Sequence, residues 1–159
     1  MKIKLMSKKE AIRYSAIEHK ETSVVISISC DGKTRLLSNN NIKDVLYLMF
    51  QDITKEQANK YDLECMSEQD GEMIKRFVNK WKDKVDSIII HCHAGISRSS
   101  AVAIGVSRYL GYDDMWVWKG DYSPNSHVLD IVNKVLNLRM SKDNIKELYE
   151  IAYINRVRN

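Results

Sequence analysis

The stretch Ile88-Ile89-Ile90-His91-Cys92-His93-Ala94-Gly95-Ile96-Ser97-Arg98-Ser99-Ser100 decides which fold and chemistry we expect of this chain. Its apolar beginning is typical of a buried β-strand, and its end leads into a helix expected over residues 97–110. Residues 93–97 form a loop that is short enough to curl, with its backbone N–H groups pointing inward. Such a bowl at the start of a helix binds a tetrahedral dianion.

Three positions of this loop suit the binding of such an anion and an attack on it. A helix N-terminus and converging amides can lower a cysteine pKa from about 8.5 to roughly 3.5–7.5, so we expect Cys92 to be a thiolate nucleophile. Arg98 offers a planar fork of donors that matches two oxygens of the anion and keeps its charge. Gly95 lies mid-loop, where a Cβ would crowd the anion or forbid a positive φ angle.

The pattern His91-Cys92-x-x-Gly95-x-x-Arg98-Ser99 resembles the Cys-x5-Arg phosphate-binding loop of the protein tyrosine phosphatase superfamily, in the form found in small dual-specificity and bacterial tyrosine phosphatases. The resemblance implies hydrolysis of phosphate monoesters through a phosphocysteine on Cys92, with no metal and no other cofactor. It also implies that the Ser99 hydroxyl helps the thiolate to depart and that His91 holds the loop through hydrogen bonds. The phosphate-binding residues would be His93, Ala94, Gly95, Ile96, Ser97 and Arg98.

Other interpretations of the loop have less support. A structural cysteine would be an ordinary buried hydrophobe, but Gly95 and Arg98 in fixed register at a helix start would then be a coincidence. His91 and His93 could be half of a metal site, but strand alternation directs them away from Cys92, and no further Cys/His cluster completes the site. A nucleotide P-loop is excluded because no Gly-Lys-Ser/Thr follows the glycine. A sulfur-transfer loop of the rhodanese type remains a weaker alternative.

The leaving oxygen of a phosphate monoester must be protonated at neutral pH, so the site needs an acid. Asp52 follows the apolar run Val45–Phe50 and would stand at the same sheet edge as Cys92. The resemblance favours Asp52, because the family's acid comes from an earlier loop reached from the preceding parallel strand, although Asp52 lies further upstream than is usual. Asp62 is the second candidate, whereas Asp70 is expected to cap a helix.

Strand-like and helix-like segments alternate along the chain, which predicts one α/β domain over residues 1–159 with a central, mainly parallel sheet flanked by helices. We expect strands at Lys2–Met6 (an edge strand), Ser23–Ser29, Val45–Phe50 (a buried strand) and Ser87–His91. We expect helices from Ser7 to about Ile17, after Ser67, over 97–110, over 126–138 and over 142–155. Asn125 or Ser126 should cap the 126–138 helix, and the family resemblance implies that Asn125 also braces the phosphate loop.

Composition and charge favour a small cytoplasmic protein. The 159 residues include 25 Lys and Arg against 21 Asp and Glu, and the resulting +4 is spread along the chain. No nucleic-acid partner is therefore expected, while a mildly basic surface suits a phosphorylated substrate. Neither a signal peptide nor a membrane span is evident. Cys30 and Cys65 are expected to be structural, although either could trap an oxidised Cys92 as a disulfide. The oligomeric state stays open.

Phosphotyrosine in a protein is the substrate we expect. The first alternative is a dual-specificity or phosphoinositide and inositol phosphate phosphatase, but relatives with lipid specificity place lysines inside the loop, whereas residues 93–97 add no fixed charge. The alternative of another class is a module that binds phosphoprotein with little turnover. Cys92, Arg98 and a candidate acid argue against that module.

Overall fold

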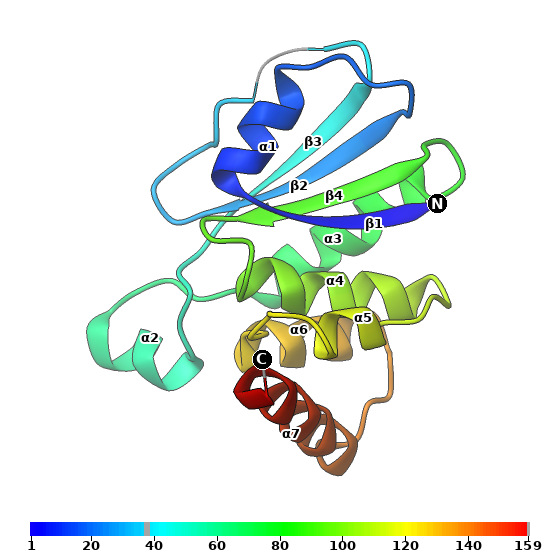
Figure 1. Ribbon diagram of the computed structural model, residues 1–159. Coiled ribbons are helices and arrows are strands. Elements are labelled where there is room, and N and C mark those ends of the chain that lie inside the picture. The colour runs from blue at the N-terminus through cyan, green and yellow to red at the C-terminus, as the bar shows by residue number, and fades with distance from the viewer. Residues whose placement is uncertain (37–38, 159) are drawn as a thin grey trace.

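The four strands of the computed structural model, which describes residues 1–36 and 39–158, lie side by side in one parallel sheet (Figure 1). They are, in chain order, β1 (Lys2–Ser7), β2 (Ser23–Ser29), β3 (Ile42–Met49) and β4 (Ser87–Cys92), and their order in the sheet is β1-β4-β2-β3. Every pair of neighbours is parallel, so the predicted α/β architecture with a parallel sheet is confirmed. The carboxyl ends of all four strands meet at one edge, where β4 ends with Cys92.

Helices cover both faces of this sheet (Figure 1). On one face lies α1 (Lys8–Ser15), and on the other lie α3 (Glu68–Trp81) and α4 (Arg98–Tyr109). Beneath those two, a further layer contains α5 (Met115–Trp118), α6 (Ser126–Val135) and α7 (Lys142–Arg158), while α2 (Lys55–Tyr61) stands away from the sheet.

The two central strands carry the core. Both β2 and β4 are buried along their whole length, because each has a neighbouring strand on either side and helices over its faces. Side chains of β2 and β4 that face α3 and α4 join one apolar cluster, which includes Val24, Ile26, Ile88, Ile90, Ile74 and Val102. Burial of each such side chain contributes roughly 1.5–3 kcal/mol. The loop that follows β4 therefore begins at the most deeply buried part of the sheet.

Several elements differ from those predicted. Of the run Val45–Phe50, predicted as a buried strand, all but Phe50 belongs to the edge strand β3, most of whose residues are only half-buried. The helix predicted over 126–138 ends at Val135, because Asn137 and Arg139 adopt left-handed φ angles of 54° and 58°. The short helices α2 and α5 were not expected. Lys2–Met6 is confirmed as part of an edge strand.

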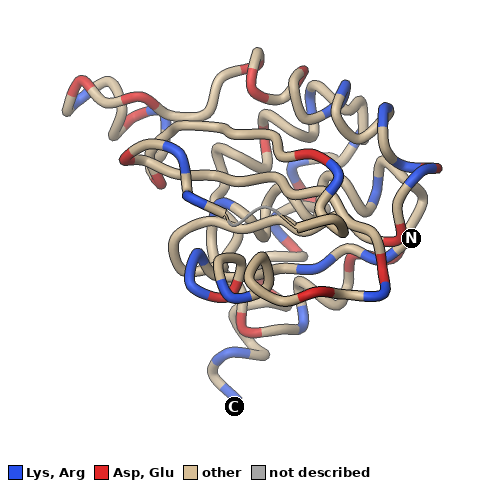
Figure 2. Tube along the Cα trace, turned by 90° about the horizontal axis from the view of Figure 1, so that it is seen from above, with Lys and Arg blue, Asp and Glu red and all other residues tan. Residues whose placement is uncertain are grey.

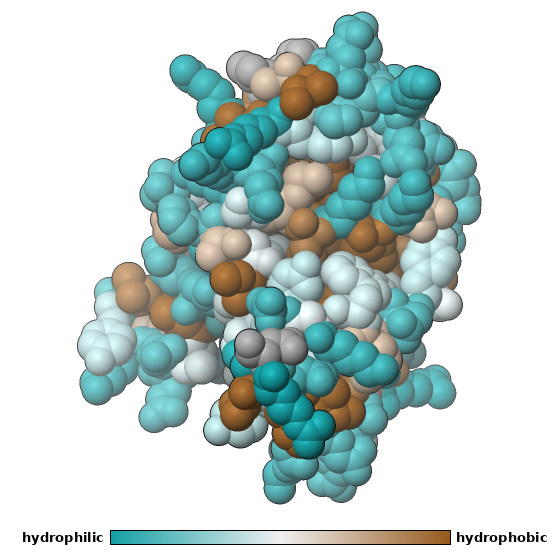
Figure 3. Space-filling model, in the orientation of Figure 1, coloured by the Kyte–Doolittle hydropathy of each residue, from teal (hydrophilic) through white to brown (hydrophobic). Residues whose placement is uncertain are grey.

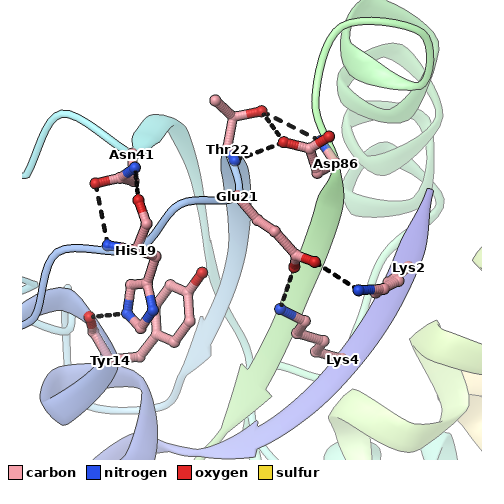
Figure 4. Close-up of polar contacts among 8 residues, drawn as sticks. All are labelled: Lys2, Lys4, Tyr14, His19, Glu21, Thr22, Asn41 and Asp86. Carbon is pink, nitrogen blue, oxygen red and sulfur yellow. Dashed lines mark hydrogen bonds and ion pairs between the residues drawn. The ribbon is translucent and has the colours of Figure 1, made fainter.

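A polar network holds the segment that follows α1 (Figure 4). Glu21 accepts hydrogen bonds from Lys2 and Lys4 of β1, the latter at 3.0 Å. The His19 ring stacks on the Tyr14 ring of α1 with centroids 3.6 Å apart, and His19 Nε2 lies 2.9 Å from the Tyr14 carbonyl oxygen. These contacts fix the end of α1 against the edge of the sheet.

Candidate active site

Strand β4 ends at Cys92 and helix α4 begins at Arg98. The loop between them packs against the start of α1. Both residues are buried, with exposed fractions of 2% for Cys92 and 4% for Arg98. Gly95 has a φ of +77°, and a Cβ at this position would lie 2.8 Å from backbone atoms of Met6 and Ser7. Only glycine satisfies both the positive φ and the close approach, so the conformation expected of Gly95 is observed.

The thiol of Cys92 lies in surroundings that stabilise its charged form. Burial by itself raises the pKa of this thiol, but hydrogen bonds from the Ser99 side chain and backbone and from the Gly95 backbone, with the charge of Arg98, outweigh burial and lower the pKa. Cys92 Sγ and Ser99 Oγ are 3.2 Å apart. The site therefore makes the thiolate, which is the nucleophilic form of cysteine, easier to form than at an ordinary cysteine.

The helix start behind the loop is left open to an anion. Ser97 occupies the N-cap position of α4 but makes no side-chain cap hydrogen bond. Its hydroxyl donates instead to Asp52 Oδ1 at 2.8 Å. No cap therefore occupies the first amides of α4: that of Ser99 donates to the Cys92 thiol, and this end of the helix favours a negatively charged group.

Among the hydrogen-bond donors of the Arg98 guanidinium, Nη1 has a partner and Nε has none in the described part of the chain. Its Nη1 donates to the Phe50 carbonyl at 2.8 Å, which orients the guanidinium toward the strand ends. Its Nε is buried and has no hydrogen bond from the residues that the structure describes. Leaving a buried donor unpaired costs about 1–3 kcal/mol, and a bound phosphate oxygen could remove that cost.

Asp52 lies beside the loop, at the edge of the sheet predicted for it from the sequence. Its Oδ1 accepts hydrogen bonds from Ser97 Oγ and from Asn125 Nδ2, each at 2.8 Å. Asn125 also caps α6, since its side-chain oxygen accepts from the Val128 amide at 3.0 Å, which confirms the expected cap. Sequence reasoning missed the Ser97–Asp52 bond.

The two other aspartates considered as acids have different surroundings. Asp62 is the C-cap of α2, with a left-handed φ of 52° and an exposed side chain, in the part of the chain that stands away from the sheet. Asp70 completes a capping box with Ser67 at the start of α3, as expected.

His91 and His93 lie on either side of Cys92 in the chain and differ in exposure. His91 is buried, and its Nδ1 makes a long 3.5 Å contact with the Cys92 carbonyl oxygen. Burial, with a smaller effect of the Lys8 charge, lowers the pKa of His91 and favours the neutral ring. His93 is exposed at the rim of the loop, as are Ala94 and Ile96.

The remaining cysteines are free thiols. Cys30 is exposed, so the structural role expected of it is wrong: it does not pack in the core. Cys65 is half-buried. A small pocket at the strand ends is lined by Cys30 together with Arg98, His93 and Lys8.

The charged residues of the chain are of mixed sign, and the face seen in Figure 3 is largely polar. Figure 2 shows positive and negative residues interspersed along the trace, and Figure 3 shows a largely hydrophilic face with apolar side chains in separate small groups. Within residues 1–36 and 39–158, no group of three or more His, Cys, Asp or Glu side chains is placed to hold a metal ion. None of the described helices has the length and apolar character needed to cross a membrane.

Comparisons with solved structures identify the fold. The chain is similar to a human tyrosine phosphatase-like serine/threonine/tyrosine-interacting protein, with a TM-score of 0.62, 16% sequence identity, and coverage of 87% of this chain and 93% of the other. It is also similar to a single-residue variant of human DUSP28, with a TM-score of 0.50, 10% identity, and coverage of 99% and 93%. No protein-family model and no curated protein sequence matches the chain. The protein thus has the fold of the tyrosine and dual-specificity phosphatases.

Proposed function

We propose that this chain is a phosphatase that hydrolyses phosphate monoesters through a covalent intermediate on Cys92, with phosphotyrosine in proteins as its substrate. The observation that carries the proposal is the buried Cys92 thiol, whose pKa is lowered in a loop that ends in Arg98. A thiolate is a strong nucleophile, and a guanidinium beside it can hold the phosphate that it attacks.

In the first half-reaction, the amides of residues 93–97 and the Arg98 guanidinium hold the non-bridging phosphate oxygens. The thiolate Sγ of Cys92 attacks phosphorus, and the bond between phosphorus and the ester oxygen breaks. Asp52 donates its proton to the departing oxygen, so that the alcohol or phenol leaves uncharged. The products are phosphocysteine and a carboxylate on Asp52.

In the second half-reaction, the Asp52 carboxylate takes a proton from water as the water oxygen attacks phosphorus. The phosphorus–sulfur bond breaks and Cys92 departs as a thiolate. Ser99 Oγ lies 3.2 Å from Sγ and can donate a hydrogen bond to it, which stabilises the departing group. Inorganic phosphate leaves, and both Cys92 and Asp52 return to their starting states.

Binding without turnover is the alternative of another class. One structure with this fold is described as phosphatase-like and interacting, so the fold by itself does not separate an enzyme from a binding module. Three features of this chain support turnover: the stabilised thiol, a hydroxyl beside it and a carboxyl group bonded to the loop. A binding module needs none of the three.

The substrate class rests on the loop and its surroundings. Residues 93–97 contribute no fixed charge to the bowl, which fits a monophosphate ester better than a headgroup with several phosphates. A dual-specificity or phosphoinositide phosphatase is the second candidate. A catalytic thiolate must stay reduced, which agrees with the cytoplasmic location expected from the sequence.

The proposal is tested by phosphate release from matched peptides that carry phosphotyrosine, phosphoserine or phosphothreonine, with a soluble inositol phosphate alongside. We expect phosphotyrosine to be hydrolysed at least tenfold faster than the others, with no effect of a metal chelator. Cys92→Ser should bind phosphotyrosine peptide without turning it over. Equal or faster release from the inositol phosphate would favour the second candidate, and binding by the unaltered protein without release would favour a binding module.

A further inference from the structure

A group of positive charges adjoins the phosphate loop on the side of α1. Lys8, Lys9 and Arg13 of α1, together with His93 of the loop, line a shallow pocket. Half-buried Ile12 lies between them and adds an apolar surface to the lining. We call this set of five residues the basic pocket.

The basic pocket adjoins the loop that holds Arg98. Lys8 and His93 line it and also line the small pocket that contains Arg98. The backbone N–H of Lys8 donates to the His93 carbonyl at 3.0 Å, so the first turn of α1 is fixed directly against the loop. If the phosphate of a substrate binds at Arg98, a group close to that phosphate in the substrate would therefore lie next to the first turns of α1.

The positive charge of the basic pocket is only partly neutralised. Asp31 lies 3.7 Å from Lys8 Nζ and offsets part of that charge. Glu10 is engaged in the capping box at the start of α1, and its charge also attracts Arg13 without a direct salt bridge. Lys9 and Arg13 are exposed and form no salt bridge with any residue in the described ranges. Two cations are thus available to an external anion.

The helix that presents these cations is fixed at both ends. The capping box of Ser7 and Glu10 closes its start, and the stack of Tyr14 on His19 holds its end (Figure 4). Cations on a fixed element bind with less loss of conformational freedom than cations on a mobile loop.

We propose that the basic pocket binds a second anionic group of the substrate, a carboxylate or phosphate on a residue near the phosphotyrosine. This assigns an acidic or doubly phosphorylated segment of protein as the preferred substrate class. The inference rests on the proposed function, because it places the phosphotyrosine in the Cys92 loop. Ile12 would contact the apolar stem of the acidic residue.

The test measures binding of two phosphotyrosine peptides to Cys92→Ser protein by titration calorimetry. One peptide has glutamates on both sides of the phosphotyrosine, and the other has glutamines. We expect the acidic peptide to bind roughly tenfold tighter at low salt and the preference to shrink at high salt, because the cations are exposed. Adding Lys9→Gln and Arg13→Gln should reduce the preference to about twofold or less.

A matched control carries Arg76→Gln and Lys82→Gln, which remove the same charge from α3 and its C-cap on the opposite face of the sheet. It should keep the full preference, which separates a local site from general attraction. Equal binding of both peptides, no binding of either, or the same loss in the control would overturn the proposal. Stronger competition by a soluble inositol bisphosphate than by a doubly phosphorylated peptide would also overturn it.

The same peptides separate this inference from the proposed function. If the unaltered protein releases phosphate from both peptides at equal efficiency and binds both equally, the basic pocket has no role but the phosphatase proposal stands. If it binds the acidic peptide tightly but releases no phosphate, the pocket is supported and turnover is not.

Discussion

The Ser97 hydroxyl donates a 2.8 Å hydrogen bond to Asp52 Oδ1, and so joins the loop between Cys92 and Arg98 to the segment that follows β3. Asn125 donates a second hydrogen bond to the same oxygen, also at 2.8 Å. Two donors on one oxygen fix the orientation of the carboxyl group. Its other oxygen, Oδ2, has no hydrogen bond from the described part of the chain, and in the proposed mechanism it faces the departing oxygen.

Asp52→Asn should lower kcat on a phosphate ester with a poor leaving group by about 10²–10⁴-fold, the usual contribution of general acid–base catalysis. The matched variant Asp62→Asn should change kcat little, because Asp62 only ends α2. Steady-state kinetics on phenyl phosphate would measure both. The reverse result would identify Asp62 as the acid, and no effect of either would place the donor elsewhere.

Ser97→Ala should act through Asp52. Without its donor the carboxyl group is less well oriented, so we expect kcat/KM, which reports the first half-reaction alone, to fall roughly tenfold for phenyl phosphate and much less for p-nitrophenyl phosphate, whose leaving group needs no proton. The ratio of the two rates is the measurement. An equal loss on both substrates would mean that Ser97 supports the loop and not the acid.

Ser99→Ala should raise the pKa of Cys92, because the Ser99 side chain is the largest of the effects that lower it. A hydrogen bond worth about 1 kcal/mol corresponds to roughly a fivefold smaller thiolate fraction at a pH below the pKa. Alkylation of Cys92 by iodoacetamide requires the thiolate, so its rate should fall as the pH is lowered through the pKa of Cys92. In Ser99→Ala this fall should occur at a higher pH than in the unaltered protein. The control is Ser107→Ala, another buried serine of α4. An unchanged pH profile in Ser99→Ala would contradict the role of this hydroxyl.

Gly95→Ala should destabilise the protein by roughly 3 kcal/mol or more, because the φ of +77° is strained for alanine and the Cβ would meet backbone atoms at 2.8 Å. Gly111 is a matched control, since it has a similar φ of +75° but open space around a Cβ. Gly111→Ala should cost only about 1 kcal/mol. Urea unfolding measures both, and equal losses would show that the packing against Met6 and Ser7 is unimportant.

Part of this architecture could be predicted from sequence because it depends on local patterns. The isoleucines before Cys92 mark a central strand, and the helix after Arg98 follows within a few residues, so their placement at a strand end and a helix start required no long-range information. Asp52 could be placed at the same edge because parallel strands end together.

Contacts that depend on the path of the chain could not be predicted. The bonds from Ser97 to Asp52 and from Arg98 to Phe50 join residues 45 and 48 positions apart. Their formation depends on how the segment after β3 turns back toward the loop. Within that segment α2 was overlooked because it is short and has only one buried residue, although the capping box of Thr54 and Gln57 was a readable signal.

The central claim is that Cys92 carries the phosphoryl group during turnover. Mass spectrometry of protein quenched in alkaline denaturant, in which the phosphorus–sulfur bond is stable, while it hydrolyses p-nitrophenyl phosphate tests this claim most directly. The account predicts one added phosphoryl group on the peptide that contains Cys92, with a larger fraction modified in Asp52→Asn, because loss of the base slows the second half-reaction. Steady release of phosphate with no phosphoryl group on Cys92, or with equal turnover by Cys92→Ser, would contradict it.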